Sequence, residues 1–338
     1  MTKRVTGHDV ARRAGVTQAT VSRALRNLPG TSRGTRQRVL RAAAELAYIP
    51  SENARSLSNA RTRRVAVVSD ALTNPYYPQL VEPLRRHLGS RDLQMVLVTE
   101  TTGPAGTGVS LEALADGSYD GVILTTTTRT SSRPRDLTER GIPHVLVNRV
   151  LDVPESPGCT VDNTGGVMRV ADLLVRAGHR RIAVIQGPTD TSTGRERATG
   201  FRAGLRRHGV PLPRSLVRRT VFDHDAAMGA AISLLHSPDP PTAVFGGNDV
   251  IALGVLSAAT TLGIRVPEDL TVIGFDDIPM AGWPLVGLTT VHCDLDALAQ
   301  VAVDLLARQL RGGAVAPETR RIPVSLVERR THGPAPTR

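Results

Sequence analysis

The sequence predicts two doubly wound parallel α/β lobes, preceded by a small N-terminal unit of three helices and a short hinge helix. Three observations lead to this fold class. From residue 65 onward, short apolar runs typical of buried strands alternate with helical patterns. The first 64 residues have helical periodicity instead. They also hold 14 Lys/Arg against 3 Asp/Glu, so this segment alone accounts for the net charge of +11.

The composition is that of a globular protein with more than one domain. The chain has 338 residues, of which 40% are hydrophobic, which is enough for a large core. No apolar run is long enough to span a membrane, and the start, MTKRVTGHDV, lacks the apolar core of a signal peptide. Cys159 and Cys293 lie too far apart to suggest a disulfide framework or a zinc site. We expect a cytoplasmic protein without a metal or cofactor.

The stretch Asp9–Asn27 predicts two short helices joined by a tight turn. Gly15 suits the left-handed conformation that ends a helix, and Thr17 is a good N-cap for a second helix over Gln18–Leu25. The apolar positions are Val10, Ala11 and Ala14 in the first helix and Val21, Ala24 and Leu25 in the second. The outer face of the second helix carries Gln18, Ala19, Ser22 and Arg23. This pattern indicates a helix-turn-helix, and its coincidence with the basic segment predicts contacts with DNA phosphates.

A third helix and a hinge complete the basic segment. Thr35 is the expected N-cap of a helix over Arg36–Leu46, whose predicted inner face is Val39, Leu40, Ala43 and Leu46. This helix ends before Pro50. The next stretch, Ser51–Asn59, is compatible with a short helix or with a plain linker, because so short a helix is unstable alone in water.

Two series of strands and helices follow. The strands of the first series are expected at 65–69, 95–98, 121–125 and 144–147, with helices near 77–88 and 135–140 and a weak helical segment before 121. After a helical crossover at 161–178, the second series has strands at 181–187, 216–222, 242–248 and 270–277 and helices near 196–208, 226–235 and 249–262. In such sheets, ligands bind beyond the carboxyl ends of the strands.

The amino-acid sequences of several motifs resemble those of the lactose/galactose-repressor family of bacterial transcription regulators. These motifs are VTGHDVARRAGVTQATVSRAL, VDNTGG, GHRRIAVIQGP, RERATGF, GNDVIALG, VPEDLTVIGFDD and LTTV. The resemblance covers residues 5 to about 331 and implies a headpiece at 1–50, a hinge at 51–63 and a periplasmic-binding-protein-like core at 64–331. We expect residues 332–338 to form a short disordered tail.

The resemblance also implies how the headpiece and hinge contact DNA. Gln18 and Ala19 are expected to face base edges, and Arg23 a guanine or a phosphate. The expected phosphate partners are Thr6, Thr17, Thr20, Ser22, Ser32, Thr35, Tyr48 and Asn53. In the hinge, Ala54 lies beside Leu57, which matches the leucine that the family wedges into the minor groove. Arg26 departs from the family pattern, in which Asn follows the VSRxL segment directly.

Effector-binding residues are expected at or just after the strand ends. Asn148, Asn248 and Asp276 stand at such positions, and Arg197 is expected in the loop after strand 181–187. The three strand-end residues are also compatible with helix capping or turn chemistry. Tyr76 is expected to stack on the ligand, with Phe222 or His224 as the other wall. Because Arg and a carboxylate can bind vicinal hydroxyls, a sugar-like effector is expected, with a purine as the alternative.

An enzyme and a solute-binding transport component are the two alternative classes of protein. H-E-x-x-H and C-x-x-C motifs are absent from the sequence, and Gly103–Gly108 lacks the Lys-Ser/Thr of a phosphate loop, which argues against an enzyme. A solute-binding transport component would share the core but would need a signal peptide and would not carry a basic headpiece. The favoured interpretation is an effector-controlled repressor that binds a pseudo-palindromic operator. The segment after Thr331 has no apolar heptads, which favours a homodimer.

Overall fold

The computed structural model describes residues 5–25, 27, 29–48, 61–69, 72–100 and 109–337. The chain divides into two compact units, Met1–Thr62 and Arg63–Arg338, which are described separately. The predicted hinge residues Asn53, Ala54 and Leu57 lie outside the described residues, as do Arg26 and the segment 103–108. Among the helices that are described, none is long and apolar enough to cross a membrane.

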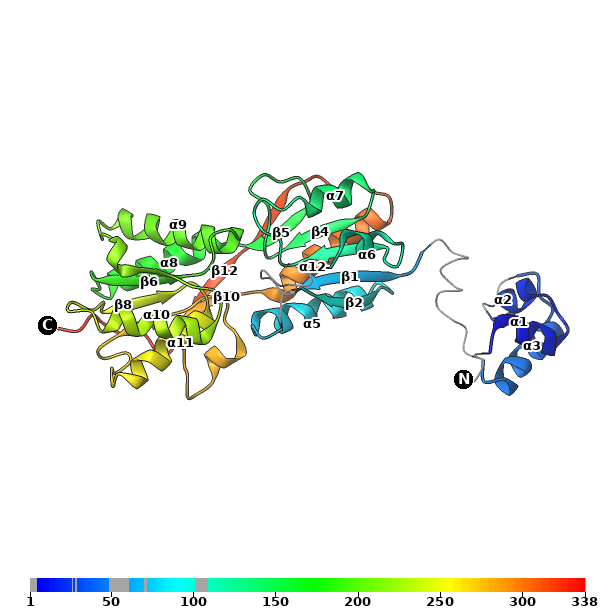
Figure 1. Ribbon diagram of the computed structural model, residues 1–338, viewed down its shortest axis with the longest axis horizontal. Coiled ribbons are helices and arrows are strands. Elements are labelled where there is room, and N and C mark those ends of the chain that lie inside the picture. Colours follow the sequence, from blue (N-terminus) through cyan, green and yellow to red (C-terminus); the bar gives the residue numbers. More distant parts are fainter. Residues whose placement is uncertain are drawn as a thin grey trace. The chain divides into compact units, whose positions relative to one another are not determined.

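In its described residues, the first unit is a bundle of three helices (Figure 1), α1 (Gly7–Ala14), α2 (Gln18–Leu25) and α3 (Arg33–Glu45). Its buried core is formed by Val10, Ala11, Ala14, Val21, Ala24, Val39, Ala42 and Ala43. Leu25 and Leu46 are partly buried against this core. One expectation was wrong: Leu40 is 45% exposed, because Ala42 occupies the inner face of α3 in its place.

Local interactions fix the ends of these helices. Thr6 and Asp9 form a reciprocal capping box at the start of α1, and Gly15 ends it with a φ of 65°. The Thr20 amide donates to the Thr17 hydroxyl at 3.2 Å, as expected for an N-cap. The expected cap of α3 was wrong. Ser32 caps this helix by accepting from the Thr35 amide, and α3 therefore begins at Arg33.

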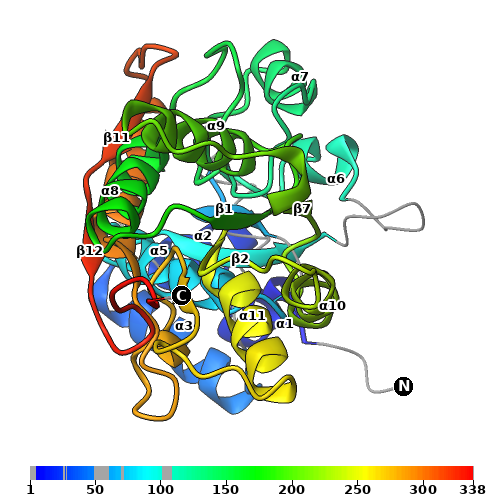
Figure 2. The same cartoon turned by 90° about the vertical axis from the view of Figure 1, so that its left-hand side faces the viewer.

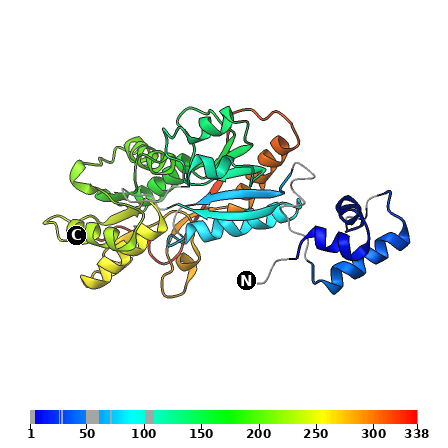
Figure 3. The same ribbon diagram turned by 45° about the vertical axis from the view of Figure 1, so that its right-hand side comes forward.

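The first lobe of the second unit has a six-stranded sheet with the order β11-β5-β4-β3-β1-β2. Its strands are β1 (Arg64–Ser69), β2 (Gln94–Thr99), β3 (Gly121–Leu124), β4 (His144–Val147), β5 (Gly158–Val161) and β11 (Thr319–Ile322), all parallel to their neighbours. Its helices are α5 (Tyr76–Gly89), α6 (Leu111–Ala115), α7 (Arg133–Glu139) and α12 (Leu295–Leu310). Figure 3 shows the cyan helix α5 running along β1 and β2.

The two faces of this sheet bury alternate residues of each strand, as the pleat requires. In β1, Val65 and Val67 pack on the side of α5 and α12. Ala66 and Val68 pack on the other side with Leu114 of α6. Because both faces are covered, the strand is apolar throughout, and this is why it could be recognised in the sequence.

The second lobe has a four-stranded parallel sheet with the order β7-β6-β8-β9. Its strands are β6 (Ile182–Gln186), β7 (Val217–Arg219), β8 (Ala243–Gly246) and β9 (Thr271–Ile273), and its helices are α8 (Asn163–Arg176), α9 (Ser192–Arg207), α10 (His224–Leu235) and α11 (Asp249–Thr261). Figure 2 shows α8 and α9 together on one side and α10 and α11 on the other. The fold class predicted from the sequence is confirmed.

The chain passes between the lobes three times. It leaves the first lobe after β5, returns through β10 (Thr290–Cys293) to α12, and crosses again between β11 and β12 (Val324–Val327). β10 and β12 pair in an antiparallel ribbon. The sequence analysis did not predict β5, β10, α12, β11 or β12. The crossover helix expected at 161–178 begins at Asn163, after β5. The strands expected at 216–222 and 270–277 are also shorter than expected.

The C-terminal tail was expected to be disordered, and this expectation was wrong. The Gly333 amide donates to the Thr271 hydroxyl at 3.1 Å, and the Ala335 amide donates to the Ala177 carbonyl at 2.8 Å. His179 lies 3.1 Å from the Gly333 carbonyl and is fully buried, and this burial lowers the pKa of its imidazole. These contacts attach the tail to the second lobe.

Candidate effector site and DNA-reading face

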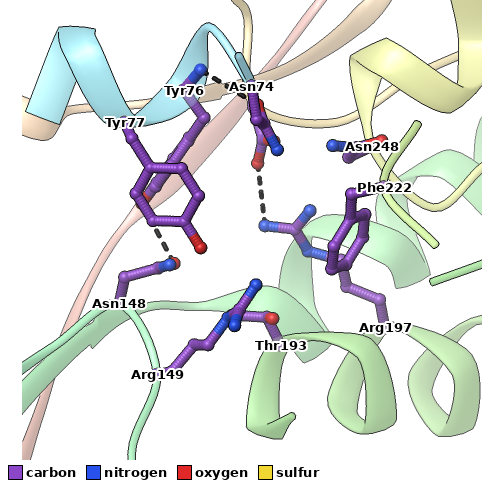
Figure 4. A pocket seen from close by; sticks show the side chains of 10 residues that line it. Asn74, Tyr76, Tyr77, Asn148, Arg149, Thr193, Arg197, Phe222 and Asn248 are labelled. Atoms are coloured by element: carbon purple, nitrogen blue, oxygen red, sulfur yellow. Dashed lines mark hydrogen bonds and ion pairs between the residues drawn. The ribbon is translucent and has the colours of Figure 1, made fainter. Parts of the chain in front are cut away.

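Ten residues from the two lobes of the second unit line a pocket (Figure 4). All six residues predicted for the effector site are among them: Tyr76, Asn148, Arg197, Phe222, Asn248 and Asp276. The sequence reasoning missed Asn74, Tyr77, Arg149 and Thr193. His224, the alternative to Phe222, is not part of the lining and is 2.9 Å from Ser257 instead.

Arg197 is the most highly connected side chain of this pocket. Its Nε donates to Asn163 Oδ1 at 2.8 Å, its Nη1 donates to the Gly247 carbonyl at 3.0 Å, and its Nη2 donates to Asp276 Oδ1 at 2.8 Å. Its guanidinium carbon also lies 3.8 Å from the centre of the Phe275 ring. The residue was expected in a loop, but it lies in α9, which begins at Ser192 after its Thr191 N-cap. The helix and these bonds hold the guanidinium in one orientation.

Asp276 lies directly beyond the last strand of the second sheet. Its φ of 118° is rare for a residue with a side chain, and such strain is concentrated at functional sites. Burial raises the pKa of its carboxyl, while Arg197 and a hydrogen bond with Asn248 act in the opposite direction. Asn248 also caps α11 by accepting from the Ile251 amide at 3.0 Å. Asn248 therefore caps a helix, which the sequence also allowed, and lines the pocket as well.

The first lobe contributes a polar pair and aromatic surface. The Tyr76 hydroxyl donates to Asn148 Oδ1 at 3.0 Å, and burial raises the pKa of this tyrosine well above its ordinary value. Tyr76 and Tyr77 meet edge to face, with ring centres 5.7 Å apart. Phe222 contributes a third ring from the second lobe. Amide groups beside aromatic rings are suited to a ligand that has both polar edges and apolar faces.

Arg149 has no comparable set of partners. Its side chain is almost completely buried, with its guanidinium carbon 5.9 Å from the ring centres of both Tyr77 and Phe222 (Figure 4). Its Nε has no hydrogen-bond partner among the residues that the structure describes. The residue follows Asn148 at the carboxyl end of β4, and this position was the signal by which the sequence could have indicated it.

Behind the pocket lies a second buried carboxyl. Asp249 Oδ2 accepts from the Ile278 amide at 2.8 Å, and Oδ1 accepts from the Thr290 hydroxyl at 2.5 Å. Burial raises the pKa of Asp249 to about 7, and the nearby charge of Asp276 acts in the same direction. Asp249 connects α11 with the segment after β9 and with the first residue of β10.

In the first unit, the predicted base-reading residues lie on one exposed face of α2. Gln18, Ala19 and Arg23 are exposed, and Ser22 is half-buried. Of the predicted phosphate partners, Thr6, Thr17 and Ser32 are exposed caps, Thr20 and Thr35 are half-buried beside them, and Tyr48 packs partly against the core. The caps leave hydroxyl groups at the helix starts, where backbone amides favour anions. No residue in this face was contradicted by the structure.

Comparison with known proteins agrees with this architecture. Residues 6–51 match the family model described as bacterial regulatory proteins, lacI family, and residues 171–332 match a periplasmic binding protein-like domain. The transcriptional regulator CelR of Thermobifida fusca is 34% identical over 322 residues, which cover 93% of this chain and 94% of CelR. The chain belongs to the LacI family. The ribose operon repressor of Escherichia coli K12 is 32% identical, with coverage of 95% and 98%.

Solved structures of LacI-family proteins have the same fold over nearly the whole chain. A complex of CelR with cellobiose gives a TM-score of 0.74 at 33% identity and covers 97% of this chain and 100% of CelR. The lac repressor dimer bound to its operator and the anti-inducer ONPF gives 0.83 at 27% identity, with coverage of 97% and 99%. The expected family, fold and class of function are confirmed: the chain is a DNA-binding transcriptional regulator. In the described part of the chain, no cluster of His, Cys, Asp or Glu could hold a metal ion.

Proposed function

We propose that this LacI-family protein is a repressor that binds a pseudo-palindromic operator as a homodimer and is controlled by a small effector in the pocket around Arg197. In this proposal it acts by binding and not by catalysis, and it does so in the cytoplasm, where operator DNA is found. The observation that carries the effector assignment is the pocket itself. Residues of both lobes line it, and its central cation and carboxylate are fixed by hydrogen bonds.

A ligand in this pocket would contact both lobes at once. Asn148 and Tyr76 come from the first lobe, and Arg197, Asn248 and Asp276 from the second. A ligand of this kind stabilises the arrangement of the lobes that gives the most contacts. It changes operator affinity only if the DNA-bound and free states differ in ligand affinity. The predicted hinge at 51–63, with Asn53, Ala54 and Leu57, is the proposed link to the DNA.

A sugar or sugar derivative is the proposed effector, and a purine is the second candidate. Paired amide, carboxylate and guanidinium groups can bind vicinal hydroxyls, and aromatic rings can stack on a sugar face. The relatives support the first candidate, since CelR was solved with cellobiose and another relative is a ribose operon repressor. The purine candidate is supported by the similarity to the repressor PurR, which is 29% identical over 333 residues.

The proposal is tested in two steps on the full-length protein. A binding selection with random DNA should yield a two-fold symmetric site, and a thermal-shift screen of sugars, sugar phosphates and purines should yield a stabilising ligand. The stabilising ligand should then change the affinity for the selected site. A selected site without symmetry would contradict the dimer, and a stabilising ligand that leaves operator affinity unchanged would contradict the control function.

A further inference from the structure

The charged groups that line the effector pocket do not balance. Arg149 and Arg197 are cations, and Asp276 is the only carboxylate among the described lining residues. Arg197 already has Asn163, Gly247 and Asp276 as partners. The carboxylate of Asp276 is thus occupied, and Arg149 remains without a counter-ion among the described residues.

Such an arrangement is costly unless a ligand completes it. The Arg149 residue is only 7% exposed, and its Nε is buried without a hydrogen-bond partner among the described residues. Arginine does not deprotonate in proteins, so this residue cannot relieve its burial by losing its charge. Two aromatic rings at 5.9 Å hold the guanidinium in place and offset part of the cost. A buried charge normally has an ionic partner, and none of the described residues supplies one to Arg149, so an anionic ligand would complete this part of the pocket.

We propose that the effector carries an anionic group, a carboxylate or a phosphate, on a small polyhydroxylated body, and that Arg149 is the counter-ion of this group. The remaining lining residues supply what the rest of such a ligand needs. Asn74, Asn148, Asn248 and Thr193 offer amide and hydroxyl groups for the hydroxyls, and the tyrosines offer aromatic faces. Together these groups suit a small ligand that combines hydroxyls with an apolar ring face.

The first test needs no ligand. Replacing a buried cation that has no counter-ion by an apolar side chain of similar length removes the cost of its burial. The ligand-free Arg149→Met protein should therefore unfold about 2 °C or more above the wild type. The matched control is Arg135→Met, because Arg135 is exposed on the same lobe and pairs with Glu155 at 2.7 Å. This control should unfold close to the wild-type temperature.

The second test uses matched probes, namely glucose, glucuronate, glucose 6-phosphate and inorganic phosphate, at one ionic strength. Calorimetry and thermal shift should show that the wild type binds a charged probe at least 10-fold more tightly than neutral glucose. This preference should disappear in Arg149→Met, persist in part in Arg149→Lys and be unchanged in Arg135→Met. The glucuronate and phosphate arms distinguish a carboxylate from a phosphate ligand.

Two results together would overturn the inference. Charged probes would bind the wild type and Arg149→Met equally well, and the ligand-free Arg149→Met protein would be no more stable than the wild type. The inference rests on the proposed effector role of the pocket, so operator affinity is measured on the same preparations. A charged probe that binds through Arg149 without changing operator affinity would support the anion site and contradict the control function. An effector that changes operator affinity but binds equally well to Arg149→Met would contradict the anion site alone.

Discussion

Nη2 of Arg197 lies 2.8 Å from Oδ1 of Asp276, and the side chains of both residues are only 5% exposed. The two residues come from different parts of the second lobe, α9 and the segment after β9. Each is held by further bonds, Arg197 by Asn163 and Gly247 and Asp276 by Asn248. The pair therefore joins two elements of the lobe and forms one wall of the pocket at the same time.

Breaking this pair should destabilise the core strongly. In Arg197→Met, Asp276 is left buried without its cation, and the loss should be about 3–5 kcal/mol in the free energy of unfolding. Urea unfolding of the full-length protein measures it. The control is Arg265→Met, which breaks an exposed pair with Asp269 and should cause a far smaller loss. Equal losses in the two variants would contradict the structural role of the Arg197–Asp276 pair.

Asp249 should make the stability of the core depend on pH near neutrality. Its pKa is about 7 in the folded protein and 3.8 in the ordinary state, so the folded protein binds more protons between about pH 4 and pH 7. The free energy of unfolding should therefore fall as the pH rises through this window, by on the order of 1–4 kcal/mol, and then level off.

The variant Asp249→Asn should remove this pH dependence, as measured by urea unfolding from pH 4.5 to pH 8. Asp269 supplies the control, because its hydrogen bond from Arg265 lowers its pKa to about 2, outside the window. Asp269→Asn should keep the wild-type slope between pH 5 and pH 7. A slope in Asp249→Asn equal to that of the wild type would show that other groups cause it.

Exchanging the residues at the start of α2 should change which operator is preferred. Gln18 and Ala19 are exposed there and make no part of the buried core. A lost bidentate contact with a base costs about 1–3 kcal/mol in discrimination. Binding selections with Gln18→Ala and Ala19→Gln should yield altered sites, whereas Arg38→Gln, on the exposed surface of α3, should yield the wild-type site. Identical selected sites for all variants would refute the reading role of α2.

Gly15 should be required for the turn between α1 and α2. Its φ of 65° is unfavourable for a residue with a Cβ, although no atom would contact that Cβ within 4 Å. Gly15→Ala should therefore reduce the stability of the headpiece by about 1 kcal/mol. Gly34→Ala is the matched control: this glycine lies in α3 with open space and without a positive φ, so the change should not destabilise. Amide exchange of α1 and α2 in the full chain distinguishes the two variants.

The sequence indicated those features that local patterns determine. The apolar runs at β1, β3 and β4 are buried on both faces, and Gly15 and Thr17 end and begin helices through local bonds. β7 was expected to extend to Phe222, but it ends at Arg219, and Val221 is 60% exposed. α12 was missed although its Asp294 N-cap and its helical apolar spacing are local signals. β11 has the polar sequence TRRI, and it is a strand through its long-range pairing with β5.

In the candidate site, too, local sequence patterns indicated some residues, whereas others depend on long-range contacts. Asn148, Asn248 and Asp276 could be selected because they follow apolar strand runs. Arg149 stands beside Asn148 at the same strand end, but its burial depends on Tyr77 and on Phe222 from the other lobe and is not visible in the local sequence. The hydrogen bonds of Arg197 likewise join residues 34 to 79 positions apart in the chain. Such groupings follow from the tertiary fold and not from local sequence.

The central claim is that occupancy of the Arg197 pocket controls operator binding by the headpiece. Fluorescence anisotropy of the selected operator, titrated with full-length protein with and without the stabilising ligand, tests it most directly. We predict that the ligand changes the operator Kd by about 5- to 150-fold in the wild type and by less than about 2-fold in Asn248→Ala and Arg197→Lys. The same ligand-dependent change in the wild type and in both variants would contradict the claim.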